Sequence, residues 1–221
     1  MELTRRSFLE VAASTPWLRA SRGTARSGCL VIETADCLQE SCRGYVQAGG
    51  AAPASVTALS TTPAATWIVP AGSIDRALAH RLRDAAWSGM SVLVELGVAF
   101  MDAPRGRIQR QLLADTFDLA VGDVRHLWVD GRSRIPYVQY GWPVSAWVRD
   151  FSRVVALGGP GWTPIAHMDS HPVGVGRRVG RGALTMLGSP LGPALRAGDN
   201  EAGTWLRAFL ERDEPIDAQN G

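Results

Sequence analysis

The sequence predicts an α/β domain with a mainly parallel sheet and a late β-hairpin. The chain has 221 residues, of which 46% are hydrophobic and 20% charged, which is enough for one domain with a large core. Short apolar runs rich in β-branched residues alternate with amphipathic helical patterns, as in parallel sheets covered by helices. No run of about 18 uncharged apolar residues occurs, so we expect no transmembrane span in the mature chain.

The first half of the body contains the clearest strand–helix–strand unit. Strands are predicted at 29–33, 56–59, 67–70 and 91–96. Asp36 is the expected cap of a short helix at 37–48, and Ser73 caps a longer amphipathic helix that ends at Gly89. With the strands at 67–70 and 91–96, this longer helix makes a unit of about 30 residues, the size of a right-handed crossover between parallel strands.

The second half is less regular. A helix is predicted at 107–121, and Asp199 caps a closing helix at 200–211. Further strands are predicted at 154–157, 164–168, 173–176 and 180–187, the last two forming the late hairpin. The folded domain is expected to cover 27–212, followed by a polar tail at 213–221.

The basic charge is concentrated at the start of the chain. All 23 basic residues are arginines, and residues 1–26 have a net charge of +3 whereas the remainder has −1. A nucleic-acid-binding surface needs clustered basic residues, so a near-neutral body argues against a nucleic-acid partner.

The N-terminal segment has the features of an export signal. The string Thr4-Arg5-Arg6-Ser7-Phe8-Leu9 resembles a twin-arginine (Tat) signal, and a mildly apolar stretch and small residues at 23–25 follow it. The resemblance implies that 1–26 is a targeting segment and that the mature chain is periplasmic or otherwise exported through the Tat pathway. The alternative is an ordinary amphipathic helix with two solvated arginines.

The three cysteines differ in their surroundings. Cys29 lies in an apolar run and is expected to be a buried strand thiol. Cys37 and Cys42 have C-x4-C spacing in a polar stretch, which allows a local disulfide, particularly in an oxidising compartment. A metal pair is disfavoured because structural zinc needs four ligands, and no local signature makes Cys37 a nucleophile. We therefore expect no metal and no cofactor.

The body resembles the class I glutamine amidotransferase-like superfamily. The resemblance rests on 67–72 leading into a helix and then 92–97, on the glycine-containing segment 178–188, and on the closing helix. It covers most of 28–211 and implies a flavodoxin-like three-layer sandwich. The similarity is greatest to branches without amidotransferase activity, such as the domain that accompanies some bacterial β-galactosidases.

The catalytic pattern of that superfamily is absent. Active members place a cysteine in a Gly-x-Cys-x-Gly elbow after the strand that follows the central helix, whereas this chain has Glu95-Leu96-Gly97-Val98-Ala99. No Cys, Ser or Thr stands there as a nucleophile. The late His-x-Glu of active members has a partial counterpart at 167–171, as a relic or a chance match. The resemblance therefore implies the fold without glutaminase chemistry.

Five residues are candidates for ligand binding: Glu95, Gly97, His167, Asp169 and His171. Glu95 ends a predicted central strand, where ligands approach open parallel sheets, although it can equally cap a turn or pair with an arginine. His167, Asp169 and His171 would share one face of an extended segment, as metal ligands, as ligand contacts or as a solvated loop. We expect Glu95 and at least one of these three residues to lie in the same pocket.

The aromatic stretch at 137–147 leaves two alternatives, a carbohydrate- or partner-binding surface and a core flap over the sheet. The hypothesis that these observations favour is an exported binding module for a small molecule, a glycan or an envelope protein. The alternatives are a hydrolase with a site of its own, built on His167, Asp169, His171 or Glu95, and a structural subunit of an envelope assembly.

The export hypothesis predicts that residues 1–26 direct a folded reporter protein to the periplasm. Replacing both twin arginines, Arg5→Lys with Arg6→Lys, should abolish that transport, because the Tat pathway reads the arginine pair. Fractionation of cells that carry the two fusions measures the effect. Equal export of both fusions would contradict the hypothesis.

Overall fold

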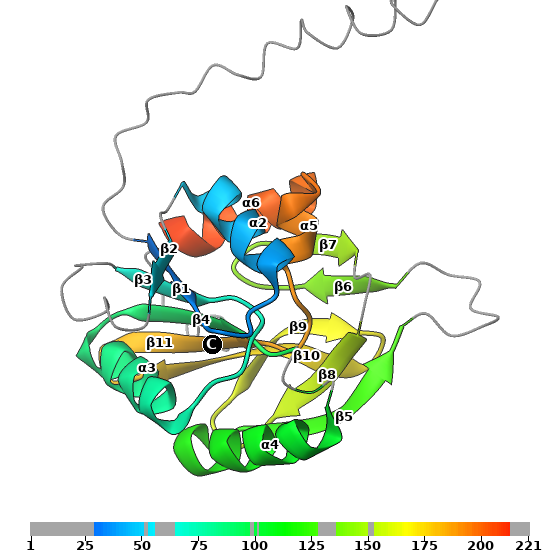
Figure 1. Ribbon diagram of the computed structural model, residues 1–221. Coiled ribbons are helices and arrows are strands. Elements are labelled where there is room, and N and C mark those ends of the chain that lie inside the picture. The colour runs from blue at the N-terminus through cyan, green and yellow to red at the C-terminus, as the bar shows by residue number, and fades with distance from the viewer. Residues whose placement is uncertain are drawn as a thin grey trace, which may run out of the picture.

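The computed structural model contains a mixed nine-stranded sheet with helices on both faces (Figure 1). It describes residues 29–50, 53–55, 65–97, 100, 102–127, 136–149 and 153–212. The predicted signal segment, the strand at 56–59 and the polar tail lie outside these residues. Among the described residues, no helix is long and apolar enough to cross a membrane.

The large sheet changes from parallel to antiparallel pairing halfway across. Its strand order is β2-β1-β3-β4-β11-β10-β9-β6-β7, with parallel pairs from β2 to β11 and antiparallel pairs from β11 to β7. Its strands are β1 (Cys29–Glu33), β2 (Pro53–Ser55), β3 (Thr66–Val69), β4 (Ser91–Glu95), β6 (Tyr137–Tyr140), β7 (Ala146–Arg149), β9 (Thr163–Met168), β10 (His171–Val179) and β11 (Gly182–Leu187). A separate antiparallel pair consists of β5 (Ala120–His126) and β8 (Arg153–Gly158).

The sheet is therefore mixed, and not mainly parallel as the sequence predicts. The parallel half follows the expected alternation of strands and helices, and the late hairpin is confirmed as β10–β11. Its turn lies at Gly180, whose φ of 58° suits glycine, because the strands continue beyond the predicted turn at 177–178. The antiparallel extension comes from β6 and β7, in the aromatic stretch where no strand is predicted.

Two hydrophobic cores lie on the two faces of the sheet. The helices on one face are α2 (Gln39–Gly49), α5 (Gly192–Arg196) and α6 (Asn200–Glu211), and those on the other are α3 (Arg76–Ser88) and α4 (Ala103–Phe117) (Figure 1). Neighbouring residues of β4 alternate between the cores: Val92 and Val94 pack towards α3 and α4, and Leu93 packs towards α2 and α6. Strands buried on both faces explain the continuous apolar runs in the sequence.

Two of the predicted helix caps are wrong. The N-cap of α3 is Asp75, whose carboxylate accepts a hydrogen bond from the Leu78 N–H at 2.7 Å, and not Ser73. Helix α2 starts after Leu38, without a side-chain cap from Asp36. Asp199 does cap α6, accepting from the Ala202 N–H at 3.0 Å. Asp36 and Ser73 are thereby available for a different contact.

Helices α2 and α5 approach each other through glycines. A Cβ on Gly44 would overlap the carbonyl oxygen of Gly192, and a Cβ on Gly192 would lie 2.7 Å from the Cβ of Ser41. Because both obstacles are close to the backbone, a side chain at either position would push the helices apart.

We predict that Gly44→Ala destabilises the fold by about 1–3 kcal/mol, the usual effect of overpacking. Gly203, in the middle of α6, is the matched control, because a Cβ there meets nothing within 4 Å. Gly203→Ala should stabilise the protein by about 0.5–1 kcal/mol through helix propensity. Urea unfolding of both variants measures the difference, and equal stability of the two would refute close helix packing at Gly44.

Candidate functional site

Glu95, at the end of β4, is completely buried, with 0% of its surface exposed. Its carboxylate accepts five hydrogen bonds from three separate segments of the chain. Oε1 accepts from the Tyr45 hydroxyl at 2.7 Å and from the N–H groups of Leu191 at 2.6 Å and Gly192 at 2.8 Å. Oε2 accepts from the Ser41 hydroxyl at 2.6 Å and the Ala71 N–H at 3.0 Å.

These contacts make Glu95 a structural link and leave it no surface for a ligand. Burial raises the pKa of Glu95, and the hydrogen bonds from Ser41 and Tyr45 act in the opposite direction. The expectation that Glu95 lines a ligand crevice is therefore wrong for this fold, since donors from the protein itself enclose the carboxylate. Gly97, two residues further on, is half-buried against Ala71.

His167, Asp169 and His171 lie at the connection between β9 and β10, which are three and two strands away from β4. The predicted extended H-x-D-x-H segment is interrupted, because Asp169 has a φ of 54° and the chain reverses there. His167 is in β9 opposite Gln139 of β6, whereas His171 begins β10. Within the described part of the chain, no group of three or more His, Cys, Asp or Glu residues could hold a metal ion.

The aromatic stretch is divided between core and surface. Tyr140 and Trp142 are buried, and they pack on Trp205 and Phe209 of α6. The Trp205 indole N–H also donates to the Trp142 carbonyl at 2.8 Å, which satisfies its polar atom. Trp147, by contrast, has 54% of its surface exposed. The stretch is therefore not a flap over the sheet: its two ends belong to β6 and β7 of the sheet itself, and Tyr140 and Trp142 contribute to the core.

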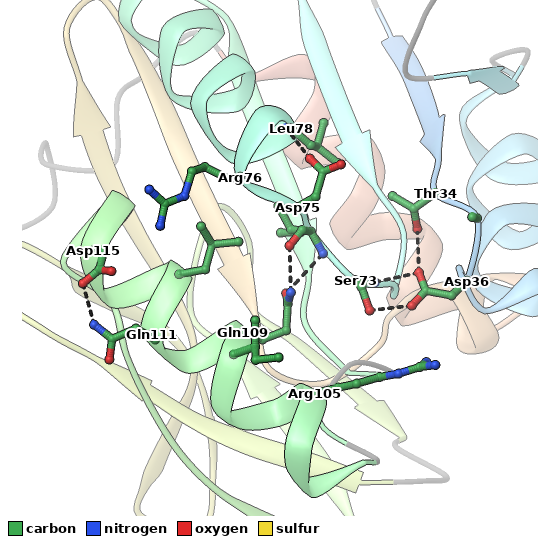
Figure 2. Close-up of a pocket in the computed structure, with 14 residues that line it drawn as sticks. Thr34, Asp36, Ser73, Asp75, Arg76, Leu78, Arg105, Gln109, Gln111 and Asp115 are labelled. Atoms are coloured by element: carbon green, nitrogen blue, oxygen red, sulfur yellow. Dashed lines mark hydrogen bonds between the residues drawn. The ribbon is translucent and has the colours of Figure 1, made fainter.

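A cavity of about 920 Å³ lies at the carboxyl ends of β1 and β3 (Figure 2). Three segments line it: residues 34–36 after β1, residues 73–78 after β3, and the side of α4 between Arg105 and Asp115. We call it the switch-point cavity, because its two loops leave neighbouring parallel strands towards opposite faces of the sheet. The loop after β1 leads to α2 on one face, and the loop after β3 leads to α3 on the other.

This divergence is the reason why a cavity forms here. In open α/β sheets, connections that turn to opposite faces leave a crevice outside the strand ends, and ligands bind there. Gly72 keeps the two loops in contact, because any Cβ at this position would overlap the Thr34 hydroxyl. The two loops thus meet at Gly72, next to the cavity.

Asp36 and Ser73 face each other across the two loops (Figure 2). The Ser73 N–H donates to Asp36 Oδ1 at 2.9 Å, the Ser73 hydroxyl donates to Oδ2, and the Thr34 hydroxyl lies 3.4 Å from Oδ1. Partial burial would raise the pKa of Asp36, but these hydrogen bonds outweigh it and hold the pKa below its usual value. The contact is therefore complete above pH about 4 and is lost as the pH falls through the lowered pKa.

The opposite wall of the cavity is set by α4. The buried amide of Gln109 holds the loop in place, accepting from the Ile74 N–H at 3.1 Å and donating to the Ile74 carbonyl at 2.7 Å. Buried Leu78 and Leu112 form an apolar floor. The exposed Arg76 and Arg105 add positive charge to the lining, and Asp75 and Asp115 add negative charge.

Asp36 and Ser73 each fit a local helix-capping pattern in the sequence, and this pattern hides their mutual contact. A related signal could have found Asp36: Glu95 is a charged residue that ends a buried strand, and Asp36 is a charged residue three positions after the end of β1. Glu95 and the three residues at 167–171 are not among those that line the switch-point cavity.

No protein-family model and no curated protein matches the sequence. The fold is similar to part of the cold-adapted β-galactosidase from Rahnella sp. R3, with a TM-score of 0.57 and 11% identity over 83% of this chain and 30% of that one. It is also similar to the exo-β-1,4-mannosidase from Opitutaceae bacterium strain TAV5, with a TM-score of 0.56 and 11% identity over 84% of this chain and 36% of that one. The chain thus spans about a third of either glycosidase.

A third similar structure matches over almost its whole length. It is a protein described as cytoplasmic from Salmonella typhimurium LT2, with a TM-score of 0.58 and 12% identity over 83% of this chain and 98% of that one. At these identities the similarities establish a shared α/β fold with a large mixed sheet.

We predict that Glu95→Gln destabilises the fold strongly. An amide places an NH2 group against at least two of the five donors, and each buried donor left without an acceptor costs about 1–3 kcal/mol. Glu33→Gln is the control, because Glu33 also ends a parallel strand but is exposed; its effect should stay within about 0.5 kcal/mol. Thermal unfolding of both variants measures the difference. Equal melting temperatures would contradict the structural role of Glu95.

Proposed function

We propose that the chain is an exported binding module that holds a small polyhydroxylated molecule, such as a sugar, in the switch-point cavity. The observation that carries this proposal is the position of the ionised Asp36, paired with Ser73 at the diverging loops of β1 and β3 and facing a cavity of about 920 Å³. Cavities of this size accommodate small organic ligands.

The lining supports a ligand with hydroxyl groups. Asp36 Oδ2 accepts one hydrogen bond from Ser73 and has a further lone pair, and the Ser73 oxygen can itself accept. Arg76 and Arg105 add donors, while Leu78 and Leu112 offer an apolar surface to C–H groups. The fold similarity to parts of a β-galactosidase and a mannosidase is compatible with a sugar ligand, although it carries no site residues.

The proposal also includes the fold family of the domain. We infer a flavodoxin-like three-layer domain of the glutamine amidotransferase-like type, without that superfamily's nucleophile. The support is the order β2-β1-β3-β4-β11, which matches the 2-1-3-4-5 order of flavodoxin-like sheets, whose ligand lies between the first and third strands. Export by residues 1–26 would place the site outside the cytoplasm.

The geometry favours binding over the alternative hydrolase. Glu95 cannot be the acid or base of that hydrolase, because its carboxylate is enclosed by five donors and has no exposed surface. The other candidates, His167, Asp169 and His171, do not line the switch-point cavity. A general acid or base must reach the proton that it transfers. In the cavity itself, the lowered pKa of Asp36 makes it a weak base for activating Ser73.

The test is binding of D-galactose and D-mannose to the full chain. Calorimetry measures the affinity, and the NMR shifts of backbone amides locate the site. We expect the Ser73 and Ile74 amides to shift, and Asp36→Asn to weaken binding by about 10- to 100-fold, because a hydrogen bond to a charged group is lost. Asp84→Asn is the control, since Asp84 is exposed on α3 outside the cavity. Absence of shifts with both sugars, or equal loss in the two variants, would refute the proposal.

A further inference from the structure

Two thiols lie close together beside the switch-point cavity. The Sγ atoms of Cys37 and Cys42 are 3.3 Å apart, and both cysteines are free. Cys37 belongs to the loop after β1, next to Asp36, and Cys42 lies in the first turns of α2. A disulfide has an S–S length of about 2.05 Å, so a movement of little more than about 1 Å would close the bond.

We propose that Cys37 and Cys42 form a disulfide that holds the loop between β1 and α2, and Asp36 with it, in the conformation that lines the cavity. The link to ligand binding rests on the function proposed above, whereas the cross-link and its effect on the loop do not. The bond would join the cavity loop to a helix that Glu95 already fixes through Ser41 and Tyr45.

The packing around Cys37 explains why a cross-link there would act on the site. The Leu38 N–H donates to the Ala71 carbonyl at 2.6 Å, and the Cys37 N–H donates to the Thr34 carbonyl at 3.2 Å. A Cβ on Gly72 would lie 3.2 Å from the Cα of Cys37, so the two loops are in direct backbone contact. Restraining Cys37 therefore restrains the backbone on both sides of the Asp36–Ser73 contact.

The thiols have different exposure and hence different roles. Cys37 is half-buried and meets the oxidant, whereas Cys42 is 3% exposed and burial raises its pKa. The Cys37 thiolate attacks a low-molecular-weight disulfide such as oxidised glutathione, forming a mixed disulfide and releasing one thiolate. Cys42 then attacks the Cys37 sulfur, and its proton goes to the second departing thiolate. Two protein thiols are thereby oxidised, and one small disulfide is reduced to two thiols.

The experiment compares the full chain after incubation with oxidised glutathione or with a dithiol reductant. Mass spectrometry after alkylation should find one alkylated cysteine, Cys29, in the oxidised protein and three in the reduced protein. The melting temperature of the oxidised protein should be higher by about 4–8 °C, the loop-closure effect of a short cross-link in a chain of this size. Amide hydrogen exchange at Ser73, whose N–H donates to Asp36, should be several-fold slower.

Two variants separate the cross-link from other effects of oxidation. Cys37→Ser should abolish the differences in melting temperature and exchange, whereas Cys29→Ala should keep them, because Cys29 lies in β1 away from the pair. Three alkylated cysteines after oxidation, or a cross-link that leaves exchange at Ser73 unchanged, would overturn the proposal. A cross-link with slower exchange but no galactose or mannose binding in either redox state would support it and refute the proposed sugar binding.

Discussion

The buried carboxylate of Glu95 is the contact on which the arrangement of the sheet's carboxyl edge depends. A charge without solvent is tolerated in a fold only when hydrogen bonds replace the lost water, and here five donors do so. The donors come from α2, from the loop after β3 and from the start of α5, so one side chain ties three connections to the end of β4. The close glycine contact between α2 and α5 follows from the same arrangement, because both helices must bring donors to the same carboxylate.

This contact and the switch-point cavity share one short segment of chain. Ala71 donates to Glu95, Gly72 packs on the loop after β1, and Ser73 donates twice to Asp36. The segment thus holds the cavity's polar pair at a fixed distance from a buried anchor. Such support by a rigid scaffold is what keeps binding residues on loops in place without a ligand. The thiols of Cys37 and Cys42 lie next to this segment, where the loop after β1 enters α2.

The similar solved structures show that this fold occurs in proteins of different kinds. Two glycosidases contain a comparable fold in about a third of their chains, and a Salmonella protein consists almost entirely of it. The same architecture therefore occurs alone and within larger enzymes, so function must be argued from the site of each chain. In this chain, the argument from the site leads to the side chains of Asp36 and Ser73.

The sequence by itself determined three of the parallel strands (β1, β3 and β4), the helix α3 and the late hairpin, because these depend on local periodicity and on turn glycines within a few positions. It placed α4 four residues too late, at 107–121 instead of 103–117, and did not predict β2 at 53–55. It also singled out Glu95 as unusual, since a charge after a buried strand is rare. Only the tertiary structure decided what Glu95 does, because its donors lie 24 to 97 residues away in the chain. The Asp36–Ser73 contact, 37 residues apart, was hidden for the same reason: both residues also fit local capping patterns. Local patterns report which groups are available, and the divergence of β1 and β3 decides which of them meet.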